Sequence, residues 1–167
     1  MTMCGHSTIG CVTAMLETGS TPVTGDTMEV NLDTAAGLVR TRARVEEGRV
    51  KEVTFRNVAS FHYCSGTVDV PGYGTMPYDV AYGGNTYAIT DAANMNNLNL
   101  RYGHLGEIQK AAQAFGNAVR EIVDFRHPED PFLKGISHVM FCGKPDDPRA
   151  NFRNTVIFLP SSVDRSP

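Results

Sequence analysis

The sequence lacks three features that would each identify a broad class of protein. It has no CxxC pair, and its four cysteines are too few and too dispersed for the disulfide framework of a small secreted domain. It has no apolar run approaching the roughly 20 residues that cross a membrane. Its N-terminus lacks the charged-then-apolar pattern of a secretory signal. We therefore expect a cytoplasmic protein with free thiols and no membrane partner.

The sequence also lacks any block of like charge. With a net charge of −3 and a pI of about 5.9, it has no basic surface of the kind that binds nucleic acid. Cys4 and His6 are potential zinc ligands, but no structural zinc pattern follows from their spacing, so we expect no metal. What is present is typical of a soluble globular domain, with 167 residues, 41% hydrophobic and 20% charged.

Periodicity predicts an α+β fold with more strand than helix. Apolar residues at helical spacing predict a first helix that begins at Cys4–His6 and stops at Gly19, and a second helix over 104–123. The second helix has an apolar stripe, formed by Leu105, Ile108, Ala112, Phe115, Val119 and Ile122.

Period-two alternation predicts a hairpin between residues 27 and 61, with its turn at 46–49 and its row of arginines facing solvent. Strands are also expected over 78–90, interrupted at Gly83 and Gly84, and over 136–141 and 155–159. Residues 71–77, rich in glycine and proline, are expected to form a loop.

Cys4 is the strongest candidate for chemistry. A thiol at a helix N-terminus is exposed to the positive end of the helix dipole, which favours the thiolate. Gly5 permits close approach to the backbone, and the free N–H groups of a first helical turn bind carboxylates. These properties describe a clamped carboxylate beside a nucleophilic or basic thiol, although an incidental buried cysteine is an equal alternative on composition alone.

Other candidates are weaker when taken alone. His6 lies two residues from Cys4, where helical side chains do not face each other, so a Cys–His nucleophilic pair is disfavoured. Cys11 is interpreted as a packing residue, and Cys64 and Cys142 as structural. His138, within an apolar strand pattern, is ordinarily a satisfied core histidine.

Several segments, taken in order, resemble the proline racemase family. The first is Met3-Cys4-Gly5-His6-Ser7-Thr8-Ile9-Gly10, which is similar to the family's first cysteine motif. The segments Glu52–Val58 and Tyr82–Ala88 also fit. Asn154–Phe158 and then Val163-Asp164-Arg165-Ser166-Pro167 resemble the approach to the second catalytic motif. The matches extend along the whole chain.

The resemblance implies a diaminopimelate-epimerase-like fold of two similar strand-rich halves, each around a central helix. It implies that substrate is held between two helix N-termini, and that one thiolate removes the α-proton while a thiol on the opposite face returns one. Neither a metal nor a pyridoxal cofactor takes part. The substrate class is proline or hydroxyproline, and a homodimer is left open.

When the roles of the family's residues are transferred to the matching positions, the resemblance implies that Cys4 is the first catalytic acid/base. Gly5 and His6 contact the substrate carboxylate through their backbone, and Asp164 lies near the ammonium group. His138 falls near a substrate-contacting position of the hydroxyproline-epimerase branch.

The expected domains are residues 1–45, as the remainder of the first half with the Cys4 helix, and residues 46–167, as most of the second half. We expect the chain to be an internal fragment that ends before the second catalytic helix and does not racemise amino acids alone. Two alternatives stay open, a trans-3-hydroxyproline dehydratase of the same family and a non-catalytic amino-acid-binding remnant.

Overall fold

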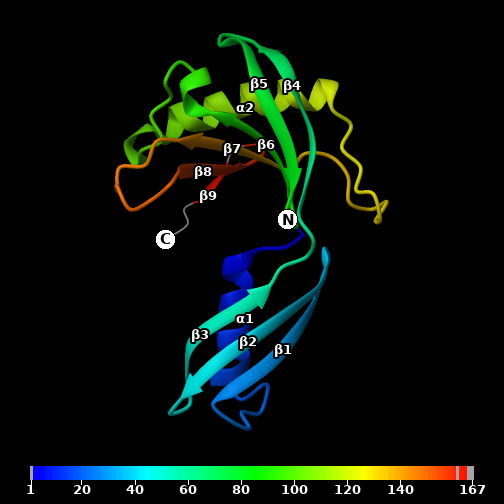
Figure 1. Cartoon of the computed structure of the whole chain (residues 1–167), viewed down its shortest axis with the longest axis vertical. Coiled ribbons are helices and arrows are strands. Elements are labelled where there is room, and N and C mark those ends of the chain that lie inside the picture. The colour runs from blue at the N-terminus through cyan, green and yellow to red at the C-terminus, as the bar shows by residue number, and fades with distance from the viewer. Residues whose placement is uncertain (1, 161, 165–167) are drawn as a thin grey trace. The chain divides into compact units, whose positions relative to one another are not determined.

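The computed structural model describes residues 2–160 and 162–164. These form two compact units, Met1–Ser60 and Phe61–Pro167, each with a sheet and one α-helix (Figure 1). Strands outnumber helices in both units, so the predicted α+β class is confirmed. Residues 165–167, which belong to the last motif of the sequence comparison, lie outside the described residues.

The first unit is a three-stranded antiparallel sheet with one helix. The helix α1, Gly5–Glu17, precedes β1, Thr27–Thr34, β2, Gly37–Glu46, and β3, Arg49–Arg56, which lie in the order β1-β2-β3. Glu47 and Gly48 both have positive φ, 49° and 73°, as the two-residue turn of a tight hairpin requires. The predicted turn at 46–49 is therefore confirmed.

Alternation along β2 puts its apolar residues on one face of this sheet. That face and α1 share a core of Val12, Leu16, Met28, Val30, Ala43 and Val45. The far end of α1 is fixed by Glu17, whose carboxylate accepts hydrogen bonds from the backbone N–H of Val50, at 2.9 Å, and from Arg49, at 2.8 Å. The Val50 hydrogen bond, with that of Arg49, holds the pKa of Glu17 below its usual range.

The second unit is a six-stranded mixed sheet. Its strands are β4, Phe61–Val70, β5, Gly74–Tyr82, β6, Thr86–Asp91, β7, His138–Gly143, β8, Arg153–Phe158, and β9, Ser162–Asp164, which lie in chain order across the sheet. Only β6 and β7 pair in parallel. A parallel pair needs a crossover, which is usually a helix. The short helices η1, Ala92–Asn94, and η2, Tyr102–His104, lead into the crossover helix α2, Leu105–Ile122.

Helix α2 confirms the predicted apolar stripe, with one exception. Ile108, Ala112, Phe115 and Val119 are almost completely buried. Ile122, at the last residue of the helix, is 55% exposed. Phe115 packs on Phe141 of β7 with ring centres 6.1 Å apart, so α2 covers the sheet face that carries Phe141.

Two sequence predictions about organisation differ from the structure. A boundary after residue 45 would cut β2, and the units instead divide between Ser60 and Phe61. The loop expected over 71–77 covers only residues 71–73, because β5 begins at Gly74. Pro77 is tolerated in β5 because the backbone pairing with β6 begins only at Asp79, so the backbone of Pro77 pairs with β4 alone, although its carbonyl accepts a hydrogen bond from the Thr90 side chain of β6.

Strand β4 had no clear sequence signal. A register shift between His62 and Cys64 interrupts its alternation, as a β-bulge does when it adds an unpaired residue.

Replacing Gly116 in α2 with alanine is expected to cost the second unit about 1–3 kcal/mol through overpacking, offset by up to about 1 kcal/mol of helix propensity. An added Cβ would lie 2.7 Å from Leu159 and 3.0 Å from Val139. Gly106→Ala is the matched control in the same helix, because nothing lies within 4 Å of its added Cβ. There alanine should stabilise by up to about 1 kcal/mol through helix propensity. Urea unfolding of the two variants measures both effects, and equal effects would contradict the close contact.

Candidate functional site

Cys4 is the N-cap residue of α1. Its backbone is extended, with φ −140° and ψ 121°, and its carbonyl accepts the first helical hydrogen bond from Thr8 N–H at 2.9 Å. Helix geometry leaves the amide groups of the first turn without carbonyl partners inside the helix. The Cys4 side chain does not cap them. Cys4 therefore lies at a helix N-terminus, as predicted, and Gly5 and His6 are the first two residues of the helix.

Cys4 lines a cavity of about 340 Å³ within the first unit. The helix contributes residues three, four and seven positions apart, which share one face. The end of β1 closes the other side. The full lining is Thr2, Met3, Cys4, Ser7, Thr8, Cys11, Leu32, Asp33 and Thr34.

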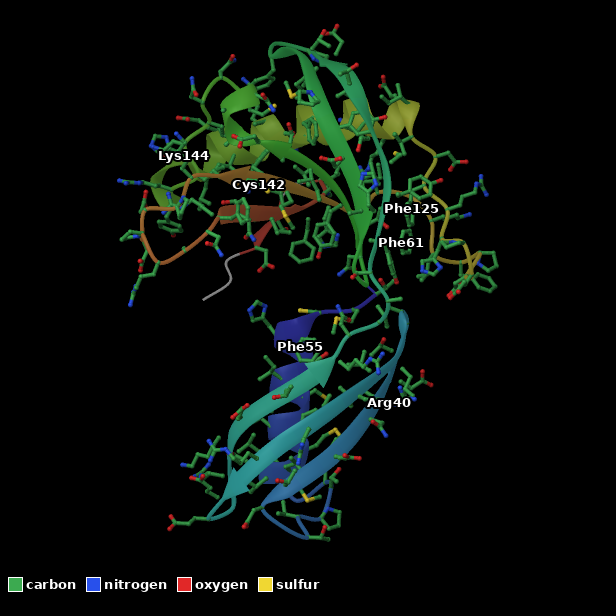
Figure 2. All side chains as sticks on the ribbon, viewed as in Figure 1. Arg40, Phe55, Phe61, Phe125, Cys142 and Lys144 are labelled. Carbon is green, nitrogen blue, oxygen red and sulfur yellow. The ribbon has the colours of Figure 1, made fainter. Side chains whose placement is uncertain are left out.

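Gly5 has a packing role that the sequence did not reveal. An added Cβ would lie 3.1 Å from Cζ of Phe55, whose ring comes from β3 and lies beside the first turn of α1 (Figure 2). A side chain at residue 5 would therefore push against this ring. Gly5 lets the helix start close to the sheet, in addition to any role toward a ligand.

Cys11 is not the packing residue that was expected. It is exposed, and its Sγ lies 3.8 Å from Met15 Sδ. The helix turns Val12 toward the sheet, and the neighbouring Cys11 consequently points elsewhere. Burial raises the pKa of the Cys64 and Cys142 thiols, which keeps both protonated and suits a structural role.

In the second unit, strand register puts His138 and Asp164 on the same face of the sheet. His138 pairs with Phe158, while Met140 pairs with Val156, which in turn pairs with Asp164. Paired residues share a face, and so do residues two apart along a strand. Since Phe141 faces α2, these residues lie on the face opposite that helix.

His138 is 2% exposed and is flanked by two aromatic rings. The centre of its ring lies 5.0 Å from that of Tyr87 and 4.4 Å from that of Phe158. Burial lowers the pKa of His138 from its ordinary value of 6.5 to about 4, while the carboxylate of Asp164 acts in the opposite direction. His138 is therefore neutral at physiological pH.

The core-histidine alternative predicts that both ring nitrogens have partners. Nδ1 lies 2.6 Å from Ser137 Oγ. Nε2 is buried without a hydrogen-bond partner among the described residues. A buried polar atom of this kind calls for an explanation, and a role in binding is one.

Asp164 lines a cavity of about 440 Å³ in the second unit, together with residues of β8, of α2 and of the segment before α2, and His138 is not among the lining residues. Arg153 and Tyr102 also line this cavity, and Arg153 pairs with Asp146. Within residues 2–160 and 162–164, no group of three His, Cys, Asp or Glu side chains is placed to hold a metal ion. No helix in the same residues is both long and apolar enough to cross a membrane.

Sequence reasoning did not predict which residues contact the candidates. Phe55, Tyr87, Ser137 and Phe158 contact Gly5 or His138. Ser137 is the sequence neighbour of His138, and Phe55, Tyr87 and Phe158 lie in segments that resemble the family. Their contacts with Gly5 and His138 were not predicted, because those of the three aromatic residues depend on strand pairing.

The comparisons with known proteins agree on one family. The family model described as proline racemase matches residues 1–167. The proline racemase of Clostridioides difficile is 36% identical over 168 residues, covering 100% of this chain and 50% of that protein. A 4-hydroxyproline 2-epimerase of Streptosporangium roseum is 40% identical over 166 residues, covering 99% of this chain and 49% of that protein. The resemblance expected from the motifs is confirmed.

A solved structure gives the same result for the fold. The hydroxyproline epimerase of Agrobacterium vitis, crystallised with bound trans-4-hydroxy-L-proline, matches with a TM-score of 0.90 at 30% identity. The match covers 99% of this chain and 48% of that one. The expected fold is thus confirmed, and the chain spans about half the length of the relatives it matches.

Acidification is expected to destabilise the folded chain through His138. Because its pKa is about 4 in the folded chain and ordinarily 6.5, the unfolded chain takes up the proton first as the pH falls. Above about pH 6.5 His138 should have no effect on the free energy of unfolding. Between pH 6.5 and pH 4, its protonation in the unfolded chain should lower that free energy by about 3 kcal/mol. Urea titrations at a series of pH values measure it. A His138→Gln variant with the wild-type slope over this range would contradict the assignment.

Proposed function

We propose that this chain, which belongs to the proline racemase family, contributes the first acid/base thiol and substrate-binding residues of a cofactor-independent amino-acid isomerase. The substrate class is proline or hydroxyproline. The proposal rests chiefly on one observation, that Cys4 is the N-cap residue of α1 and opens into a cavity beside the first helical turn.

The chemistry required is removal of a weakly acidic α-proton. In this proposal the Cys4 thiolate takes the proton, and the electron pair left at the α-carbon spreads into the substrate carboxylate. Backbone N–H groups at Gly5 and His6 bind that carboxylate as its charge grows. Removing one such preorganised donor typically costs about 2.7–4 kcal/mol of transition-state stabilisation. A helix dipole alone is worth only about 0.3–1 kcal/mol at an exposed site, so the directed hydrogen bonds dominate.

Inversion also requires a proton donor on the opposite face of the α-carbon. We assign that role to a second thiol that follows the Asp-Arg-Ser-Pro motif in the family, beyond Pro167. The reaction balances without an external oxidant or cofactor, since one proton leaves to one sulfur and another returns from the second. The 167-residue chain, which supplies only the first of these two thiols, is proposed to be inactive alone.

Two residues of the second unit are proposed to contact the substrate. Asp164 provides a carboxylate for the ammonium group, and it lines a cavity. His138 is proposed to contact a ring substituent, and its buried, unpartnered Nε2 supports this role. That observation favours a hydroxylated substrate over proline itself. The complete enzyme is proposed to be a cytoplasmic homodimer.

Ligand protection of Cys4 tests the proposed site without requiring turnover. Iodoacetamide should alkylate Cys4, and trans-4-hydroxy-L-proline at about ten times its dissociation constant should slow this roughly tenfold, because only the free protein reacts. Peptide mass spectrometry follows each thiol separately. Cys64, which lies in the other unit, is the internal control, and Cys11→Ser removes the second thiol of the same cavity. Equal slowing at Cys64, or none at Cys4, would count against the proposal.

The purified 167-residue chain should produce no D-proline from L-proline and no epimer from trans-4-hydroxy-L-proline. The physical reason is that Cys4 can serve only one face of the α-carbon. Chiral chromatography measures the products, with the intact Clostridioides difficile proline racemase as the positive control. Epimer formation that exceeds the level in a Cys4→Ser variant would show that one thiol is sufficient.

A further inference from the structure

The two ring nitrogens of His138 have different surroundings. Nδ1 lies 2.6 Å from Ser137 Oγ, whereas Nε2 is buried and has no hydrogen-bond partner among the described residues. A neutral imidazole carries a proton on one nitrogen and a lone pair on the other. The location of that proton decides whether Nε2 offers a donor or an acceptor to a ligand.

Ser137 has a second contact that constrains the proton. Its Oγ lies 3.2 Å from the backbone carbonyl oxygen of Thr86. A carbonyl oxygen can only accept a hydrogen bond, and the serine hydroxyl has only one proton to donate. The hydroxyl therefore donates either to Thr86 or to Nδ1 of His138.

The two arrangements differ in how many polar groups they satisfy. If the hydroxyl donates to Thr86, Nδ1–H donates to Ser137 Oγ, and both contacts become hydrogen bonds. If the hydroxyl donates to Nδ1 instead, two oxygens face each other without a proton, and an N–H at Nε2 is buried without an acceptor. The first arrangement satisfies one more hydrogen bond and avoids an unpaired buried donor. Burial lowers the pKa of His138 to about 4, so the argument applies to a neutral ring.

We propose that Ser137 is a positioning residue that holds His138 in its Nδ1–H tautomer, so that Nε2 accepts a hydrogen bond from a hydroxyl group of the bound ligand. The chain of donors runs from the His138 ring through Ser137 to the Thr86 carbonyl on β6. The hydroxylated ligand rests on the proposed function, whereas the tautomer rests on the two contacts of Ser137 Oγ and on the unpartnered Nε2.

Nitrogen-15 spectra of the histidine rings test the tautomer directly in the full chain. We expect His138 to carry its proton on Nδ1 in the wild type, with its signals assigned by their loss in His138→Gln. Ser137→Ala should shift the population toward the Nε2–H form, and Ser137→Thr, which keeps a hydroxyl, should restore Nδ1–H. A wild-type His138 protonated at Nε2 would overturn the proposal and leave the proposed isomerase function standing.

Ser65→Ala is the matched control, because Ser65 Oγ lies 2.8 Å from Nε2 of another histidine, His62. It should leave the His138 signals unchanged. A change as large as that of Ser137→Ala would mean that the effect is general, and would contradict the assignment.

Ligand binding gives the second readout. Ser137→Ala should weaken trans-4-hydroxy-L-proline about tenfold and leave L-proline unchanged, as measured by isothermal titration calorimetry. An equal loss for both ligands would assign Ser137 a structural role and overturn the proposal. If neither ligand binds the wild type, the proposed function fails, and the tautomer spectra still decide the part played by Ser137.

Discussion

The packing of α1 against the sheet β1–β3 is the interaction on which the Cys4 region depends. A helix of α1's length is marginal by itself in water, and its stability comes from the apolar face that contains Val12 and Leu16. Contacts at both ends then fix its position, through Glu17 with Val50 at one end and Gly5 with Phe55 at the other. The Cys4 backbone is held because the helix that follows it is held.

In the second unit, the constraint is the parallel pairing of β6 and β7. The crossover must return along the sheet, and α2 does this while burying the face that contains Val139 and Phe141. The alternate residues of the same strands are thereby directed to the opposite face. That face bears His138 and, across two strand pairings, Asp164. A single topological requirement thus separates the structural face of this sheet from the face with candidate binding residues.

The two groups of candidates differ in their electrostatic character. Cys4 relies on backbone dipoles at a helix end, which favour negative charge. His138 is kept neutral by burial, and its Nδ1 contacts the Ser137 hydroxyl. A helix end that favours negative charge suits the recognition of a carboxylate, and a neutral imidazole suits the recognition of a neutral hydroxyl.

Local sequence determined the elements whose signals are contained within a few residues. The α1 helix after Cys4, the Glu47–Gly48 turn, and the stripe of α2 follow from periodicity and turn chemistry, and the order of motifs was sufficient to indicate the family. Local sequence did not predict the bulge in β4 or the position of Pro77 within β5, because both depend on which strands pair with β4 and β5.

Only the tertiary structure decided what surrounds each candidate. Gly5 needs Phe55 from β3, and His138 is buried beside Tyr87 and Phe158 from neighbouring strands. The boundary between the units likewise follows from β3 pairing with β2. Residue type and spacing set the helix ends and the chemistry available there. Burial, hydrogen-bond partners and hence protonation arise from contacts between segments distant in the chain, which no local pattern encodes.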